Sequence, residues 1–290
     1  MADVETRVVR SRSALRSSYA ELAPGARRVL VPTMGALHAG HAALLREGRR
    51  LAGPDGHVTA SVFVNPTQFG PNEDLDKYPR TLEADVDTCA REGVDLVFAP
   101  SADVVYRGGD PMVTVDPGPL GTLLEGAVRP GHFRGVLTVV QKLLHLTGAD
   151  VLLLGEKDYQ QLVLIKRMVF DLDLPVEVVG VPTVRDADGL ALSSRNRYLS
   201  AEERALALTV PHALDVGSGV ARNGGSARDV VSAVQAFLDD HAGLVTDYAV
   251  VTDPALGAPP EQGEARLLLA VRVGSTRLLD NAALHLGGGS

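Results

Sequence analysis

The stretch VPTMGALHAGH, residues 31–41, joins an apolar run to a segment with helical spacing. The run RVLVPT (28–33) is short and β-branched and predicts a buried strand, and HAALLREGRRLA (41–52) predicts the helix that follows it. His38 and His41 are three residues apart, which places both imidazoles on one face of the first helical turn. A helix N-terminus there presents unpaired N–H groups and a partial positive charge, which suit a phosphate. The stretch therefore predicts a strand-to-helix turn that binds an anion.

Glycines and histidines of this turn have both a functional and a structural interpretation. Gly35 and Gly40 would let the backbone approach a ligand closely. The imidazole N–H groups could stabilise negative charge that develops on a phosphorus centre. The alternatives are that the two histidines only cap or pack, or that they bind a metal, for which a third ligand is missing from the stretch.

Alternation of strands and helices continues beyond the opening stretch. Further strands are expected at 57–64, 94–100, 150–156 and 176–182, and further helices at 81–93, 135–148 and 158–172. This order predicts an α/β fold, a Rossmann-like parallel sheet with helices on both faces. The pattern of the chain changes after about residue 184.

The carboxyl-terminal part predicts a smaller α+β domain. Helices are expected at 200–221 and 226–241, and strands at 245–252 and 265–274. We therefore predict a Rossmann-like ligand-binding domain over residues 1–184 and a smaller α+β lid domain over 185–290.

Composition narrows the classes of function. Hydrophobic residues make up 45% of the 290-residue chain, the formal net charge is −8, aromatic residues are 4% and there is no Trp. A nucleic-acid partner is disfavoured, because such proteins usually carry a basic face or stacking aromatics. The single cysteine, Cys89, excludes an intramolecular disulfide and predicts a small buried side chain.

No apolar run approaches the length of a membrane span, so no membrane partner is expected. The N-terminal residues lack the apolar core of a signal peptide, and Asp3 and Glu5 argue against a transit peptide. These features predict a cytoplasmic location.

Polar residues also follow the other expected strands. In FVNPTQFGPNEDLDKYPRT (63–81), Asn65, Gln68 and Tyr78 are hydrogen-bonding groups with apolar neighbours, a mixture that suits a small hydroxylated ligand. The alternative is an ordinary proline-rich surface loop.

In LLGEKDYQQLVLIKR (153–167), Lys157 is a cation suited to phosphate. Asp158 could cap the helix, bind a ribose hydroxyl or help to hold a metal, and Gln161 could face the same cleft as Gln68. A solvated charge cluster with a helix cap is the alternative.

Two further segments carry cations or hydroxyls. LALSSRNRYLS (190–200) offers the hydroxyls of Ser193 and Ser194 and the planar guanidinium of Arg195, and its Ser200 begins a capping box. A plain turn before that helix is the alternative. The loop LEGAVRPGHFRGV (124–136) is basic and is interpreted either as a lid that faces an anion or as an interface.

These motifs resemble a known family. The tetrapeptide His38–His41 resembles the HIGH signature of nucleotidyltransferases, which transfer AMP or another nucleotide from a nucleoside triphosphate, and LSSRN (192–196) is a candidate for their second triphosphate loop. Together with FVNPTQF, YPRT, RPGHFRGV, GEKDYQQL and DGLALSSRNRYL, the chain resembles the pantothenate synthetases, or pantoate–β-alanine ligases. The resemblance covers most of residues 28–200 and continues to RLLDN at 277–281.

The resemblance implies an AMP-forming acid–amino-acid ligase of coenzyme A precursor biosynthesis. ATP and pantoate would give pantoyl adenylate and pyrophosphate, and the amine of β-alanine would then displace AMP to give pantothenate. The domain over residues 1–184 would bind the nucleotide and pantoate. The resemblance also implies Mg²⁺, which would screen the triphosphate, and a homodimer.

The resemblance assigns a role to each residue that matches a motif. The catalytic set is His38, His41 (the proton donor), Lys157, Ser193, Ser194 and Arg195. The nucleotide site would be lined by Met34, Gly35, Ala36, Leu37, His38, Ala39, Gly40, His41, Gly155, Glu156, Lys157, Asp158, Val184, Leu192, Ser193, Ser194 and Arg195. Gln68 and Gln161 would bind pantoate, Gln68 would also meet β-alanine, and Asp85 is the match for a magnesium ligand.

Two rival functions remain open at this point. A related nucleotidyltransferase that stops at an adenylated product would need no amine site. A nucleotide-binding module without turnover would bind ATP but exchange no pyrophosphate.

Overall fold

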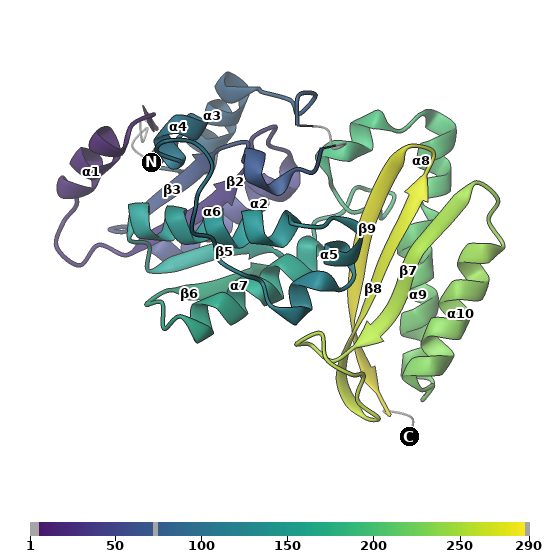
Figure 1. Cartoon of the computed structure of the whole chain (residues 1–290). Helices are drawn as coiled ribbons and strands as arrows, with labels where there is room; N and C mark the ends of the chain where they lie inside the picture. The colour runs from purple at the N-terminus through teal and green to yellow at the C-terminus, as the bar shows by residue number, and fades with distance from the viewer. Residues whose placement is uncertain (1–5, 72–74, 288–290) are drawn as a thin grey trace. The chain divides into compact units, whose positions relative to one another are not determined.

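Six parallel strands form the sheet that carries the histidine motif. Their order is β1-β4-β3-β2-β5-β6, which confirms the predicted parallel sheet. Figure 1 labels β2, β3, β5 and β6 of this sheet. The strands are β1 (Arg7–Val9), β2 (Arg28–Thr33), β3 (His57–Val62), β4 (Leu96–Phe98), β5 (Val151–Gly155) and β6 (Glu177–Val181). The structure is a computed structural model and describes residues 6–71 and 75–287. Asp3 and Glu5 lie outside the described residues.

The chain divides into two compact units. The first comprises residues 1–156 and 164–182, and the second comprises 157–163 and 183–290. The short segment 157–163 therefore belongs with the carboxyl-terminal unit, although its neighbours on both sides belong to the first. Each unit is described by itself below.

The order of the strands reverses between β2 and β5, which are neighbours through the pairs Val29–Val151 and Leu30–Leu152. From β2 the chain proceeds through β3 to β4 on one side, and β5 and β6 extend the sheet on the other. Ligands of open parallel sheets bind at such a switch point, beyond the carboxyl ends of the strands. The predicted motif follows β2 at this place.

Helices of the first unit connect the parallel strands. They are α1 (Arg12–Ala20), α2 (Ala39–Ala52), α3 (Leu82–Arg91), α4 (Ala102–Val105), α5 (Glu125–Val128), α6 (His132–Thr147) and α7 (Tyr159–Asp171), whose first turn belongs to the second unit. Short 3₁₀ turns are η1 (Pro66–Gln68), η2 (Pro119–Thr122) and η3 (Glu156–Asp158).

Alternating side chains of β2 bind the sheet to both of its covering layers. Val29 and Val31 pack in one buried cluster with Leu45 of α2 and Cys89 of α3. Leu30 lies between them and is fully buried on the opposite face, which α6 crosses in Figure 1. Both faces of the sheet are therefore covered, as predicted, and Cys89 is a buried thiol.

The second unit is an antiparallel sheet covered by helices. Strands β7 (Leu244–Thr252), β8 (Gly263–Val273) and β9 (Thr276–Leu286) pair in that order. The helices are α8 (Ala201–Ala207), α9 (Thr209–Arg222) and α10 (Ala227–Asp239), and η4 (Ser194–Tyr198) precedes them. The smaller α+β architecture is confirmed, with one strand more than the sequence predicted.

The predicted helix at 200–221 is two helices in the structure. Ser200 and Glu203 form the expected capping box at the start of α8. The helix ends at Leu208, and Pro211 lies in the first turn of α9, where its missing N–H costs no helical hydrogen bond. Within the described part of the chain, no helix is long and apolar enough to span a membrane.

Candidate functional site

The two histidines cap α2 with their side chains. His38 is the N-cap residue with an extended backbone, and its Nδ1 accepts a hydrogen bond from the N–H of Gly40 at 3.1 Å. Nδ1 of His41 accepts one from the N–H of His38 at 3.3 Å. The ring centroids are 4.1 Å apart. The structure thus brings both imidazoles together at the N-terminus of the helix.

This capping arrangement fixes the tautomers of the neutral rings. Since Nδ1 of each histidine acts as an acceptor, the ring proton of each neutral imidazole resides on Nε2. Both Nε2–H groups are then donors at a helix end whose dipole already favours negative charge. An anionic oxygen could be stabilised here without any change of protonation.

Asp85 holds the turn that leads into His38. Its carboxylate accepts hydrogen bonds from the N–H of Ala36 at 3.1 Å and of Leu37 at 2.8 Å. Ala36 has a φ of 52° and Gly35 a φ of 84°, so this turn is left-handed at two successive residues. A Cβ on Gly35 would lie 3.0 Å from Oδ2 of Asp85, which leaves room only for glycine.

The surroundings of Asp85 do not fit a hydrated magnesium ion. The residue is 1% exposed, and both carboxylate oxygens already accept backbone N–H groups. Mg²⁺ usually keeps several water ligands in an octahedral shell, which this burial leaves no room for. Among residues 6–71 and 75–287, no three His, Cys, Asp or Glu side chains are grouped so that they could hold a metal.

Gln68 lies in a buried hydrogen-bond network after β3. Nδ2 of Asn65 donates to Oε1 of Gln68 at 2.9 Å, and Oδ1 of Asn65 accepts from the hydroxyl of Tyr106 at 2.7 Å. Nε2 of Gln68 donates to Sδ of Met34 at 3.2 Å. Since Asn65 occupies the amide oxygen, the NH₂ group of Gln68 is turned toward the histidine turn. The second motif is therefore joined to the first.

The basic loop before α6 holds the backbone of Gln68. The ring of His132 bonds through Nδ1 to the carbonyl oxygen of Gln68 at 2.9 Å, and Nη1 of Arg129 lies 3.1 Å from its Nε2. From the sequence, this loop could be interpreted either as a lid that faces an anion or as an interface. The sequence did not single out Tyr106 at all, because no local pattern links it to Asn65.

Three residues predicted to bind triphosphate line one hollow in the second unit. They are Lys157, Ser193 and Arg195, and the hollow is completed by Asn196, Arg277, Asp280 and apolar side chains. Oγ of Ser193 accepts from the N–H of Arg195 at 3.2 Å and so caps η4. Nζ of Lys157 lies 3.3 Å from Oδ1 of Asp158. Two segments distant in sequence thus contribute Lys157, Ser193 and Arg195 to the lining of one small hollow.

The remaining predicted residues lie next to these groups along the chain. The N–H of Leu192 donates to the carbonyl of Val184 at 3.0 Å, which closes the loop before Ser193, and Ser194 begins η4. Gln161 lies in the first turn of α7 and belongs to the second unit, whereas Gln68 belongs to the first. Ala39 and Gly40 begin α2, and Gly155 and Glu156 end β5 and begin η3.

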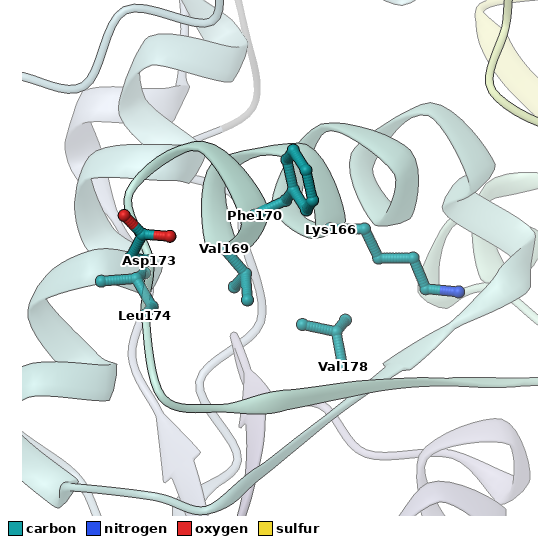
Figure 2. Close-up of a pocket in the computed structure, with 6 residues that line it drawn as sticks. All are labelled: Lys166, Val169, Phe170, Asp173, Leu174 and Val178. Atoms are coloured by element: carbon teal, nitrogen blue, oxygen red, sulfur yellow. The ribbon is translucent and has the colours of Figure 1, made fainter.

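A separate hollow lies between α7 and β6 (Figure 2). Val169, Phe170, Leu174 and Val178 supply its apolar lining, with Lys166 and Asp173 beside them. None of the predicted site residues lines it. It lacks the several convergent polar groups that a small-molecule site needs, so it is not the candidate site.

Comparison with known proteins shows the family of the chain. A family model described as pantoate-beta-alanine ligase matches residues 7–283. A pantothenate synthetase of Nocardioides sp. (strain ATCC BAA-499 / JS614) is 58% identical over 266 residues, which cover 89% of this chain and 79% of the relative. One of Saccharopolyspora erythraea is 55% identical, covering 91% of this chain and 86% of the relative.

Solved structures show the same architecture. A pantothenate synthetase of Thermus thermophilus superposes with a TM-score of 0.88 at 47% identity, covering 96% of this chain and 99% of the other. A pantoate-beta-alanine ligase of Francisella tularensis, complexed with beta-gamma ATP and beta-alanine, superposes with a TM-score of 0.78 at 33% identity, covering 96% and 97%.

Proposed function

This chain belongs to the pantoate–beta-alanine ligase family, and from that premise we propose which of its residues perform each part of the reaction. The protein is an ATP-dependent ligase that condenses pantoate with β-alanine to give pantothenate, AMP and pyrophosphate through pantoyl adenylate. The histidine turn, the Gln68 network and the Lys157 group are the three parts to which the steps are assigned.

The reaction needs positioning and charge stabilisation rather than an enzyme nucleophile. Pantoate attacks the α-phosphorus through its own carboxylate oxygen, pyrophosphate leaves, and the amine then attacks the activated carbonyl and AMP leaves. Burial raises the pKa of the Cys89 thiol to about 12, so this side chain supplies no thiolate at neutral pH. Catalysis thus rests on preorganised donors.

The observation that carries this assignment is the imidazole cap of α2. In the first step, negative charge increases on the oxygens of the attacked phosphate. Nε2–H groups of His38 and His41 are fixed as donors by their Nδ1 hydrogen bonds. We assign them to this charge, with His41 as hydrogen-bond donor to the leaving pyrophosphate. The ring of His41 keeps its Nε2 proton, because its Nδ1 already accepts the N–H of His38.

Lys157, Ser193 and Arg195 are assigned to the triphosphate. Their shared position in the lining of one small hollow supports the proposal, because guanidinium and ammonium groups are suited to phosphate oxygens. Ser194 is assigned to the same group. Gln68 and Gln161 are assigned to the hydroxyl and carboxylate of pantoate, and Gln68 also to β-alanine.

Magnesium would accompany the triphosphate and neutralise part of its charge. Since Asp85 does not fit such an ion, no step is assigned to a metal held by this side chain. We also propose, from the family resemblance, that the chain acts as a homodimer in the cytoplasm.

An isotope experiment tests the reaction and its intermediate together. The protein is incubated with ATP, β-alanine and pantoate labelled with oxygen-18 in its carboxylate. One labelled oxygen is expected in AMP, because the carboxylate oxygen that attacks phosphorus leaves with the nucleotide. Pyrophosphate release with pantoate, without AMP formation when β-alanine is added, would indicate a transferase that stops at the adenylate. Formation of ADP, or binding of ATP without any pyrophosphate release, would reject the ligase assignment.

A further inference from the structure

The motif RLLDN, Arg277–Asn281, has no role in the reaction as assigned above, although it lies in β9 beside the Lys157 hollow. Asp280 is 3% exposed and binds Arg185 with both oxygens, at 2.6 Å to Nη1 and 3.0 Å to Nη2. Arg185 pairs across an isolated bridge with Ala191, at the base of the loop that leads to Ser193. Asp280 therefore anchors the chain just before the predicted triphosphate residues.

The next residue of the same strand holds the Lys157 segment. Asn281 is 5% exposed, and its Nδ2 donates to the backbone carbonyl of Lys157 at 3.0 Å. Its Oδ1 accepts from Nε of Arg266 at 2.8 Å. Because Arg266 occupies the oxygen, the amide can present only its NH₂ group to Lys157. The orientation of this contact is therefore fixed.

Two further contacts bind the same segment to the antiparallel sheet. The guanidinium of Arg266 lies 4.0 Å from the ring centre of Tyr159, and the hydroxyl of Tyr159 donates to the carbonyl of Pro254 at 3.0 Å. These contacts explain why residues 157–163 belong to the carboxyl-terminal unit although they follow β5 of the other.

We propose that Asn281 is a positioning residue for Lys157. The dipeptide Asp280–Asn281 fixes the spacing between the Lys157 ammonium and the segment Ser193–Arg195, so that the ammonium, the guanidinium and the hydroxyls meet one triphosphate. Asn281 acts through the backbone of Lys157 and contacts no substrate. The inference rests on the proposed function of Lys157 and Arg195 in binding ATP.

The variant Asn281→Asp tests this role with little change of volume. It replaces the NH₂ donor by an oxygen that faces the carbonyl of Lys157, so the Lys157 turn must move. We expect kcat/KM for ATP to fall by roughly 10- to 100-fold, the usual effect of displacing a reacting or binding group by about 1 Å. KM for pantoate should change less, because Gln161 lies farther along the segment and Gln68 lies outside it.

A double-mutant cycle separates positioning from a general loss of structure. In the Lys157→Ala background, Asn281→Asp should have almost no further effect on kcat/KM for ATP, because the group it positions is gone. If the fold loss in kcat/KM for ATP of the double variant equals the product of the losses of the two single variants, the inference is overturned. Wild-type ATP kinetics for Asn281→Asp alone would overturn it as well.

Controls distinguish this inference from the proposed function. Leu286→Ala removes a fully packed side chain from the same strand without touching Lys157, so it should lower the melting temperature but leave ATP kinetics unchanged. If Asn281→Asp fails to fold, Arg266→Gln removes the group that orients Asn281 and should lower kcat/KM for ATP in the same direction. Wild-type kinetics for Lys157→Ala would reject both the assignment of Lys157 and the role of Asn281. If Lys157→Ala loses activity but Asn281→Asp keeps wild-type ATP kinetics, only the role of Asn281 is rejected.

Discussion

His41 combines a structural and a chemical function in one ring. Its Nδ1 accepts the N–H of His38, and its Nε2–H is assigned to the phosphate. We expect His41→Ala to abolish pyrophosphate release while ATP still binds measurably, because Lys157 and Arg195 retain their charges. Isothermal titration with ATP and a pyrophosphate-release assay measure the two effects. Wild-type pyrophosphate release would reject the assignment of His41.

Asp85 is a second residue whose substitution separates two interpretations. Asp85→Asn replaces one acceptor by an NH₂ group that faces the N–H of Ala36 or Leu37. We expect the free energy of unfolding to fall by about 1–3 kcal/mol, the cost of leaving buried polar groups unsatisfied, and kcat to fall as the histidine turn shifts. Urea denaturation and steady-state kinetics measure these changes.

The magnesium dependence decides between the two roles of Asp85. A residue that only holds the turn leaves the magnesium concentration for half-maximal activity unchanged. A large increase of that concentration in Asp85→Asn would instead identify a metal ligand. Asp87→Asn removes the same charge from an exposed position of α3 and should alter neither stability nor magnesium dependence.

At the scale of elements, the close packing of α6 against η1 positions Gln68. A Cβ added at Gly135 would lie 2.3 Å from the carbonyl oxygen of Thr67 and 2.7 Å from Cα of Gln68. We expect Gly135→Ala to displace this turn, to raise KM for pantoate and to destabilise the protein by about 1–3 kcal/mol. Kinetics with varied pantoate and thermal unfolding provide the measurements.

A second helical glycine supplies the matched control. The nearest atom to a Cβ at Gly219 of α9 is 4.0 Å away, so alanine fits there. Gly219→Ala should stabilise the protein by roughly 0.5–1 kcal/mol through its lower conformational entropy in the unfolded chain, without any change in KM for pantoate. Equal effects of the two substitutions on KM would contradict the packing argument.

Elements were predictable where the pattern was long, apolar and bounded by turn residues. Strands β2 to β6 of the parallel sheet meet this condition. Strand β1 does not, because it has three residues and only Val9 is buried. The strand β9 was missed because buried Asp280 and Asn281 interrupt its apolar pattern. The helix expected at 200–221 gave no sign of its end at Leu208 other than Pro211.

The candidate site was predictable only where its contacts are local. Spacing alone placed His38 and His41 on one helical turn. The carboxylate of Asp85, the ring of His132 and the amide of Asn281 act on backbone groups far away in the sequence, so no local pattern could reveal their partners. These supporting contacts became visible only with the fold.

At the scale of the whole molecule, a buried phenol and a buried thiol of the first unit contribute to the pH dependence of stability in alkaline solution. Burial raises the pKa of Cys89 from 9.0 to about 12 and that of Tyr19 from 10.0 to about 12. The folded state therefore binds protons that the unfolded state releases. Their contribution to stability is fully present below the unfolded pKa values and is lost as pH rises toward the folded ones.

We accordingly expect the free energy of unfolding to decrease as pH rises above 9.0, the ordinary pKa of the Cys89 thiol. Cys89→Ala should reduce the slope of this decrease without abolishing it, because Tyr19 still titrates. Urea denaturation at a series of pH values measures the slope. The same slope in both proteins would contradict the role of the thiol, and rapid reaction of native Cys89 with a thiol reagent at neutral pH would contradict its burial.

The contact between Gln68 and Met34 has a consequence for the response of the enzyme to peroxide. A thioether is a weak acceptor, so Nε2 of Gln68 can exchange Sδ of Met34 for a substrate oxygen at little cost. Oxidation to the sulfoxide would place a strongly polar oxygen at this position. That oxygen would compete with the substrate for the NH₂ group of Gln68. Reduction by methionine sulfoxide reductase would restore the weakly accepting thioether of Met34.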